Sequence, residues 1–323
     1  MPIDECFDAP ADAVERALPA TSDAAPADTR AEALLRRADA ACRRVGVDRD
    51  SVRAVVRIAV LRMAHRYGPF GDDRHAYHNE EHALGLLERT LPALLAAAPL
   101  DTADREALVL FCACHDLRQR ECGPAVGPIG ADEAASIAET ARLLAAQGLN
   151  DRRLHLALRF AIAGSTFANG TEDAEKGALV HRLGAWLDGS KPCWRDDADA
   201  VNAERLARIA ADLDTGSIGA PYAEFAAQAA ALAVELQYRA GRPLDSRAAA
   251  AACLQFLGEG QRHYVDALHR FASAEGRAAF GERRDANARR CAKTARDLAE
   301  RFPVAPADAH AVLAAFAAIT AAP

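Results

Sequence analysis

Apolar positions along the chain repeat with the period of an α-helix, and short polar breaks rich in glycine and proline separate the repeats. Residues 49–65 show this most clearly, because their valine, isoleucine, alanine and methionine positions form one wide apolar face. No stretch reads as a run of alternating strands. The pattern therefore predicts an all-α fold, with helices near residues 79–98, 102–118, 131–148, 151–165, 173–188, 200–214, 220–240, 245–271, 274–302 and 306–320, besides 29–45 and 49–65.

The pattern also predicts how the chain is organised. Pro92 lies inside the helix predicted at 79–98 and should kink or split it, because proline has no backbone donor. Residues 1–28 have few large apolar side chains and are predicted to be a loose N-terminal leader. No repeat or boundary interrupts the remainder, so residues 29–323 are predicted to form a single multi-helix domain.

Composition and charge exclude several classes of function. The net charge of −7 and the pI near 5.8 leave no basic surface signature, so binding to nucleic acid or to an anionic membrane is not expected. No apolar run reaches the roughly 18 residues of a membrane span. The eight cysteines contain no CxxC pair, and no secretory signal is visible. A cytoplasmic protein without a disulfide framework is therefore expected, and its oligomeric state is left open.

Histidine and acidic residues gather in three short motifs, which are Tyr77–His82, Cys114–Asp116 and Asp212–Asp214. His78 and His82 are four residues apart, so on a helix both rings would lie on one face. His115 and Asp116 follow an apolar helix and can converge on an ion that lies in a groove near its end. These side chains are the ingredients of a metal centre.

The third motif supplies a further carboxylate from a distant helix end, either Asp214 or Asp212, and the spacing to the glycines that follow favours Asp214. Imidazole and carboxylate ligands suit Zn, Mn, Fe, Co or Ni, and carboxylate with water suits Mg. Two histidines and two aspartates leave coordination positions open for water and substrate. That arrangement is typical of a catalytic site rather than of a closed structural site.

The order Tyr-His-Asn-x-x-His, His-Asp and a late Asp resembles the HD superfamily of metal-dependent phosphohydrolases. Asp132–Ser136 and Asp212–Gly219 are similar to stretches of its small bacterial members. Phe256–Tyr264 is similar to a late Gln-aromatic segment that occurs also in class I cyclic-nucleotide phosphodiesterases. The resemblance implies an HD/phosphodiesterase-like all-α domain. It also implies hydrolysis of a small phosphomonoester or phosphodiester, with nucleotides and cyclic nucleotides among the candidate substrates.

The resemblance implies a role for each matching residue. His78 becomes the general acid that protonates the leaving oxygen, and water activated by the ion becomes the nucleophile. Glu133 would orient His78 or a bound water. Gln261 and Tyr264 would clamp a base, unless they serve ordinary helix packing. Arg118 could bind a phosphate or could belong to a solvated helix end. The resemblance assigns the metal to four residues, His82, His115, Asp116 and Asp214.

Departures from the family pattern limit these expectations. Residues 162–167 lack the histidine that many HD hydrolases carry there, and residues 118–123 lack the second histidine of the phosphodiesterases. One divalent ion is therefore expected rather than two. The segment Asp188–Asp199, which contains Trp194, has no counterpart in the family and is expected to be a lid or an insertion.

Two other classes of protein remain as alternatives. Some HD-fold proteins are iron-dependent oxygenases with a di-iron centre, but the extra histidine ligands of that centre have no equivalent here. A catalytically inactive helical binding or regulatory protein is the second alternative, and the intact ligand set argues against it. The predicted partner is a small phosphorylated substrate.

Overall fold

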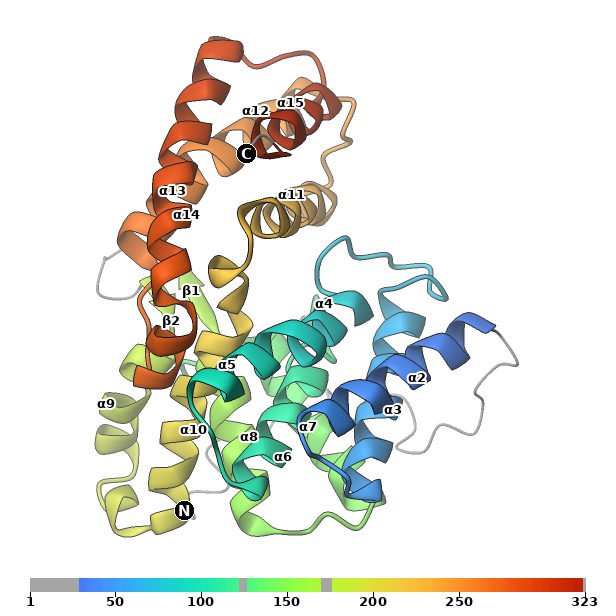
Figure 1. Cartoon of the computed structure of the whole chain (residues 1–323), viewed down its shortest axis with the longest axis vertical. Helices are drawn as coiled ribbons and strands as arrows, with labels where there is room; N and C mark the ends of the chain where they lie inside the picture. The colour runs from blue at the N-terminus through green and yellow to red at the C-terminus, as the bar shows by residue number, and fades with distance from the viewer. Residues whose placement is uncertain (1–28, 122–126, 170–175, 322–323) are drawn as a thin grey trace. The chain divides into compact units, whose positions relative to one another are not determined.

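The computed structural model describes residues 29–121, 127–169 and 176–321, and helices account for most of them (Figure 1). The all-α fold class is confirmed. The chain forms two compact units. Unit 1 contains the residues up to Arg74, Asn79–Asp214 and Ala272–Gly276, and unit 2 contains His75–His78, Thr215–Phe271 and the residues from Arg277 onward. The leader predicted at 1–28 lies outside the described residues, and the single domain predicted over 29–323 stays a prediction.

Unit 1 contains most of the helices that the apolar pattern predicts, and their ends fall close to the predicted positions. These helices are α2 (Thr29–Arg44), α3 (Asp50–Arg66), α4 (Glu80–Gly85), α5 (Leu91–Ala97), α6 (Thr102–Cys114), α7 (Ala131–Ala146), α8 (Arg152–Ser165), α9 (Val180–Ser190) and α10 (Ala198–Asp214). Among the described residues, no helix combines the length and the hydrophobicity that a bilayer crossing requires.

The core of unit 1 forms where small residues let helices approach closely. α10 packs against α8, and the buried positions of α10 include Ala203, Ala207 and Ala210. Gly164 on α8 lies against Ala207, and a side chain at Gly164 would meet the Cβ of Ala207 at 3.5 Å. Large side chains such as Phe111 on α6 fill the remaining interior and are fully buried. This packing holds the ends of α6 and α10 in place.

Two local features differ from uninterrupted helix. A π-helical turn, Leu86–Thr90, precedes Pro92 and separates α4 from α5, as expected for a proline that cannot donate its own hydrogen bond. The helix predicted at 173–188 begins only at Val180, because strand β2 (Lys176–Ala178) pairs antiparallel with β1 (Phe167–Asn169). Gly177, within β2, has a φ of +98°, which is incompatible with an α-helix.

The segment Asp188–Asp199 is an anchored connection between α9 and α10. The ring of Trp194 is buried, and its Nε1 donates a hydrogen bond of 2.8 Å to Asp188. Arg152 forms an ion pair of 2.6 Å with Asp197. These contacts fasten the segment to unit 1 and favour the interpretation as an insertion over that as a lid.

Unit 2 is built on small apolar residues. Its elements are a 3₁₀ turn at Gly216–Gly219, then α11 (Tyr222–Arg239), α12 (Arg247–Gln255), α13 (Gln261–His263), α14 (Ala274–Arg301, whose first three residues belong to unit 1) and α15 (Ala309–Ala321). Buried alanines on α11 and α12 pack with Phe316 of α15. The helix predicted at 245–271 is interrupted by two π-helical turns, Phe256–Gly260 and Tyr264–Leu268, which flank α13.

A buried ion-pair cluster joins α3 to α7 in unit 1. Glu139 is fully buried, and its two carboxylate oxygens lie 2.6 Å from Arg62 Nη1 and 2.9 Å from Arg66 Nη1. Burial lowers the pKa of Arg62, while the charge of Glu139 acts in the opposite direction. Arg66 also donates to the carbonyl of Leu117, one residue after the His-Asp motif. The cluster therefore supports the chain where the candidate ligands leave α6.

We predict that Glu139→Ala lowers the free energy of unfolding of unit 1 by about 3–5 kcal/mol, because it leaves buried arginines without a counter-ion. The control is Glu32→Ala, which removes an exposed pair with Arg36 and should cost less than about 1 kcal/mol. Urea unfolding followed by tryptophan fluorescence measures the difference, since both tryptophans, Trp186 and Trp194, belong to unit 1. Equal midpoints for the two variants would contradict the prediction.

Candidate metal centre

Three helix ends bring four side chains together in unit 1. His82 lies in the first turn of α4, His115 and Asp116 directly follow α6, and Asp214 is the last residue of α10. The Nε2 atom of His115 lies 3.1 Å from Asp116 Oδ2 and 3.3 Å from Asp214 Oδ1. The Nε2 atom of His82 lies 3.7 Å and 3.4 Å from the same two oxygens.

Neighbouring groups fix the orientation of these side chains. Asn79 caps α4 by accepting hydrogen bonds from the backbone N–H groups of Glu81 and His82. The Nδ1 atom of His115 lies 3.1 Å from the carbonyl oxygen of Phe111, so a proton on Nδ1 can be donated there, which leaves Nε2 as the free donor atom for a metal. The Asp116 carboxylate accepts a bond of 2.9 Å from the side-chain amide of Gln119.

The donor atoms of His82, His115 and Asp214 all lie within 4.8 Å of one another, a spacing that can hold one metal ion, and Asp116 lies beside them. Nitrogen and oxygen ligands bind such ions at about 2.0–2.2 Å, so neighbouring donors on one ion lie about 3–3.5 Å apart. Both distances to Asp214 Oδ1 and the distance from His115 to Asp116 lie in that range, whereas Asp116 Oδ2 is farther from His82, at 3.7 Å. Both imidazoles are buried, whereas the side chains of Asp116 and Asp214 are 13% and 26% exposed. An ion held here would therefore be reachable from the carboxylate side.

The electrostatics of the cluster are those of a site that attracts positive charge. Burial lowers the pKa of His115, but the neighbouring Asp116 and Asp214 outweigh burial and hold that pKa well above its ordinary value. Burial raises the pKa of Asp214, and contacts with His115 and His82 outweigh this effect and hold the pKa well below its usual range. In the metal-free protein, the protonated imidazole of His115 balances the negative charge of the two aspartates. A divalent cation would balance the same charge.

His78 does not share a helical face with His82, so that part of the sequence prediction is wrong. α4 begins at Glu80 because Asn79 adopts an extended conformation as its N-cap, and His78 therefore precedes the helix. In unit 2, the Nδ1 atom of His78 lies 2.6 Å from a carboxylate oxygen of Glu235 on α11. Glu235 was not identified from the sequence, since a lone glutamate 157 positions away carries no local signal.

Glu235 holds its part of the chain through several contacts. Its second oxygen accepts hydrogen bonds from the backbone N–H groups of Tyr77 and His78, at 2.8 and 2.9 Å. Burial raises the pKa of Glu235, but its contacts with His75 and His78 outweigh burial and hold the pKa far below its ordinary value. Glu235 is therefore an anion that orients His78.

The structure separates the two aspartates that the sequence left open. Asp212 is buried and accepts hydrogen bonds from the backbone N–H groups of Ala272 and Ser273 and from the Ser273 hydroxyl. Both oxygens of Asp212 are used in this way, and Gly276 leaves room for them. Asp214 instead lies with the histidines. The contacts favour Asp214 as the ligand and give Asp212 a structural role.

The other predicted site residues have different surroundings. Burial, with smaller contributions from nearby aspartates that include Asp116 and Asp214, raises the pKa of Glu133 to about 7. Arg118 is buried and pairs with Glu121 at 2.5 Å, so its guanidinium is already engaged by a carboxylate rather than solvated at a helix end. Its predicted phosphate contact stays a prediction, as does the role of Glu133.

The predicted base clamp lies in unit 2. Gln261 is buried at the start of α13, and Tyr264 is partly buried, with its ring 5.8 Å from that of His269. The π-helical turns on either side of α13 are a feature that often marks functional sites. The clamp itself stays a prediction.

The fold of the chain is similar to that of a known phosphodiesterase domain. Among solved structures, the chain is similar to the phosphodiesterase domain of the RhoPDE fusion protein from the choanoflagellate Salpingoeca rosetta. The TM-score is 0.53 at 14% identity, over 88% of this chain and 95% of that chain. The chain therefore has a phosphodiesterase-like fold. Neither a family model nor a curated protein sequence matches the chain.

We predict that Asp214→Asn weakens binding of Mn²⁺ and Zn²⁺ by more than about 100-fold, because even residues that only support a ligand contribute about 10–100-fold. The matched control is Asp212→Asn, two residues away, which should keep near-wild-type metal affinity while lowering the urea midpoint. Calorimetric titration of the metal-free proteins measures both affinities. Equal losses of metal binding in the two variants would remove Asp214 from the ligand set.

We predict that Glu133→Gln stabilises the metal-free protein at pH 8 by about 1–3 kcal/mol. The folded-state pKa of about 7 lies above the ordinary value of 4.5, so keeping this carboxylate charged opposes folding increasingly between pH 4.5 and 7 and fully above pH 7. At pH 5 most of the difference should disappear. Urea unfolding at both pH values measures it, with the exposed Glu32→Gln as the control that should show no such trend.

Proposed function

We propose that this protein is a divalent-metal-dependent phosphohydrolase of the HD type, which cleaves a phosphomonoester or phosphodiester. The observation that carries the proposal is the convergence of His82, His115, Asp116 and Asp214 at three helix ends. The phosphodiesterase-like fold supports it, because the chain aligns with nearly the whole of such a domain. Fold alone does not assign an activity, so the proposal depends on the donor set.

Each residue of the site has a definable task. A divalent ion bound here would neutralise charge on the phosphoryl oxygens and lower the pKa of bound water. Asp116 and Asp214 supply the negative charge that retains a cation, and the hydrogen bond to Phe111 presents His115 through Nε2. Glu133, with a pKa of about 7, can accept or release a proton near neutral pH.

The contact with Glu235 prepares His78 for the role of general acid. With its Nδ1–H donated to Glu235, the imidazole presents Nε2 as the atom that holds and releases a proton. The carboxylate also stabilises the protonated ring. A general acid needs this, because it must hold a proton before it donates one to the leaving alkoxide. His78 and His82 are four positions apart in the chain, so chain length alone keeps their Cα atoms within about 14 Å.

The requirement for O₂ and for a particular metal distinguishes the proposed phosphohydrolase from an iron-dependent oxygenase. An oxygenase would consume O₂ and require iron, whereas a phosphohydrolase should turn over without O₂ in the presence of Mn²⁺ or another divalent ion. A panel of p-nitrophenyl phosphate, bis-p-nitrophenyl phosphate, nucleoside monophosphates and cyclic nucleotides separates monoesterase from diesterase activity. No turnover of any phosphoester by fully metal-loaded protein would favour the non-enzymatic alternative and overturn the proposal.

We predict that His78→Asn lowers kcat by about 100- to 10,000-fold while metal affinity stays within a few-fold of wild type. Glu235→Gln should lower kcat less, and it should move the alkaline limb of the pH–rate profile to lower pH, because neutral glutamine no longer stabilises the protonated imidazole. The control is His263→Asn, on the exposed surface of unit 2. A wild-type kcat in His78→Asn would remove the acid role without affecting the metal assignment.

A further inference from the structure

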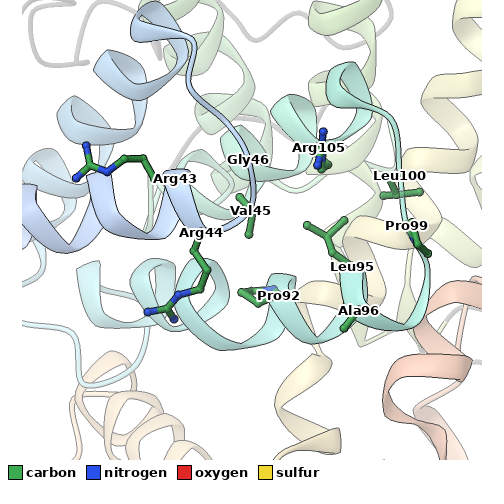
Figure 2. A pocket seen from close by; sticks show the side chains of 10 residues that line it. All are labelled: Arg43, Arg44, Val45, Gly46, Pro92, Leu95, Ala96, Pro99, Leu100 and Arg105. Atoms are coloured by element: carbon green, nitrogen blue, oxygen red, sulfur yellow. The ribbon is translucent and has the colours of Figure 1, made fainter.

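A pocket of about 410 Å³ lies in unit 1, away from the candidate metal centre (Figure 2). The end of α2, the length of α5 and the first turn of α6 surround it. Its lining residues are Arg43, Arg44, Val45, Gly46, Pro92, Leu95, Ala96, Pro99, Leu100 and Arg105. Three of them are arginines, none is acidic and the others are apolar or glycine. This local positive charge stands out in a chain whose net charge is −7.

None of the three arginines forms a direct ion pair with a carboxylate in the described part of the chain, although Arg44 lies close enough to Glu88 to lower the pKa of that carboxyl. Arg43 forms no side-chain hydrogen bond there, and Arg44 donates to the backbone carbonyl of Glu88 at 3.0 Å. Arg105 donates from Nη2 to the hydroxyl of Thr102 at 3.0 Å. Its Nε is buried without an acceptor in the described part of the chain. Elsewhere in unit 1, by contrast, arginines such as Arg62 are paired with carboxylates. The pocket therefore offers guanidinium groups that no carboxylate of the described residues pairs directly.

Backbone geometry keeps Arg105 at the pocket. Gly46 has a φ of +72°, and a Cβ at that position would lie 3.2 Å from Arg105 Nη1. The glycine thus lets the guanidinium lie close to the turn that follows α2. Arg105 is also in the first turn of α6, where the N-terminal end of the helix dipole favours a bound anion. Arg105 is the fixed cation of the pocket, and Arg43 and Arg44 extend from the end of α2 as exposed, adjustable ones.

We propose that this pocket binds a small organic phosphate, with the phosphoryl group on Arg105 and an aromatic or aliphatic body against the apolar wall. Guanidinium groups match phosphoryl oxygens in geometry and charge. Val45 and Leu95 point into the space between the turn and α5 and provide the apolar surface. The volume lies within the range of small-molecule sites, about 300–1,000 Å³. The assignment is independent of the proposed hydrolase activity.

The pocket and the metal centre lie at opposite ends of α6. Arg105 is in its first turn and His115 caps its last turn, which places them about 15 Å apart along the helix axis at 1.5 Å per residue. A small phosphate in the pocket therefore cannot contact the metal ligands. Binding at the two sites can be separated by mutation.

Calorimetric titration of the full-length, metal-free protein with phenylphosphonate tests the proposal, because its C–P bond is not a phosphoester. Arg105→Gln and the double variant Arg43→Gln/Arg44→Gln should each weaken binding at least tenfold. Raising the salt concentration from 50 to 300 mM should also weaken it. The matched control is Arg247→Gln, an exposed arginine of unit 2 that lines no part of this pocket and should bind like wild type.

A further variant keeps the proposal testable if the arginine variants fail to fold. Ala96→Phe keeps all three arginines but adds a ring to the pocket wall, and it should reduce phenylphosphonate binding while leaving inorganic phosphate less affected. Absence of binding to wild type at millimolar concentration would overturn the proposal. So would a loss of binding in Asp214→Asn with none in Arg105→Gln, since it would place the ligand at the metal centre. Equal affinities for inorganic phosphate and phenylphosphonate would overturn the assigned apolar contact.

Discussion

Two carboxylates held beside two buried imidazoles are the constraint on which the rest of unit 1 depends. Asp116 and Asp214 approach the same histidine nitrogens at 3.1–3.7 Å, where water screens their charges poorly. Positive charge must compensate them, either as a proton on His115 or as a cation. The same negative charge adds to the effect of burial in raising the pKa of Glu133. The charges of the cluster must therefore balance, and its His82, His115 and Asp214 atoms are spaced so that they could hold a metal ion.

The candidate metal ligands lie at helix ends rather than on helix faces. Contacts with residues outside the site fix the positions of those ends. The Asn79 cap starts α4, Asp212 binds the backbone of Ala272 and Ser273 just before the end of α10, and Gln119 holds the carboxylate of Asp116. A helix end permits two adjacent residues to converge on one point, which residues diverging by about 100° around a helix axis cannot do. The buried pairs of Glu139 then stabilise the chain after α6. The structural ion pairs therefore lie close to the candidate metal ligands but involve different side chains.

Similarity of fold at 14% identity shows how loosely an apolar pattern constrains residue identity. Many alanine-rich or leucine-rich sequences can fill the same core, whereas few side chains can hold a divalent cation. Function must then be argued from the side chains of the site rather than from the fold. The arginine pocket lies at the opposite end of α6 from the candidate metal centre. One helix thus contributes side chains to two separate sites.

The sequence by itself determined the helical class and most helix positions, because helical periodicity is local, and it identified the histidines and aspartates that lie together in the candidate metal centre. It favoured Asp214 over Asp212 only by spacing, whereas the structure shows the different partners of these two near neighbours. It suggested that His78 and His82 share a helical face, whereas the Asn79 cap starts α4 only at Glu80. It could not find Glu235 or the strand pair that delays α9. Those features depend on which atoms meet across long separations in the chain, and only packing of the tertiary structure decides that.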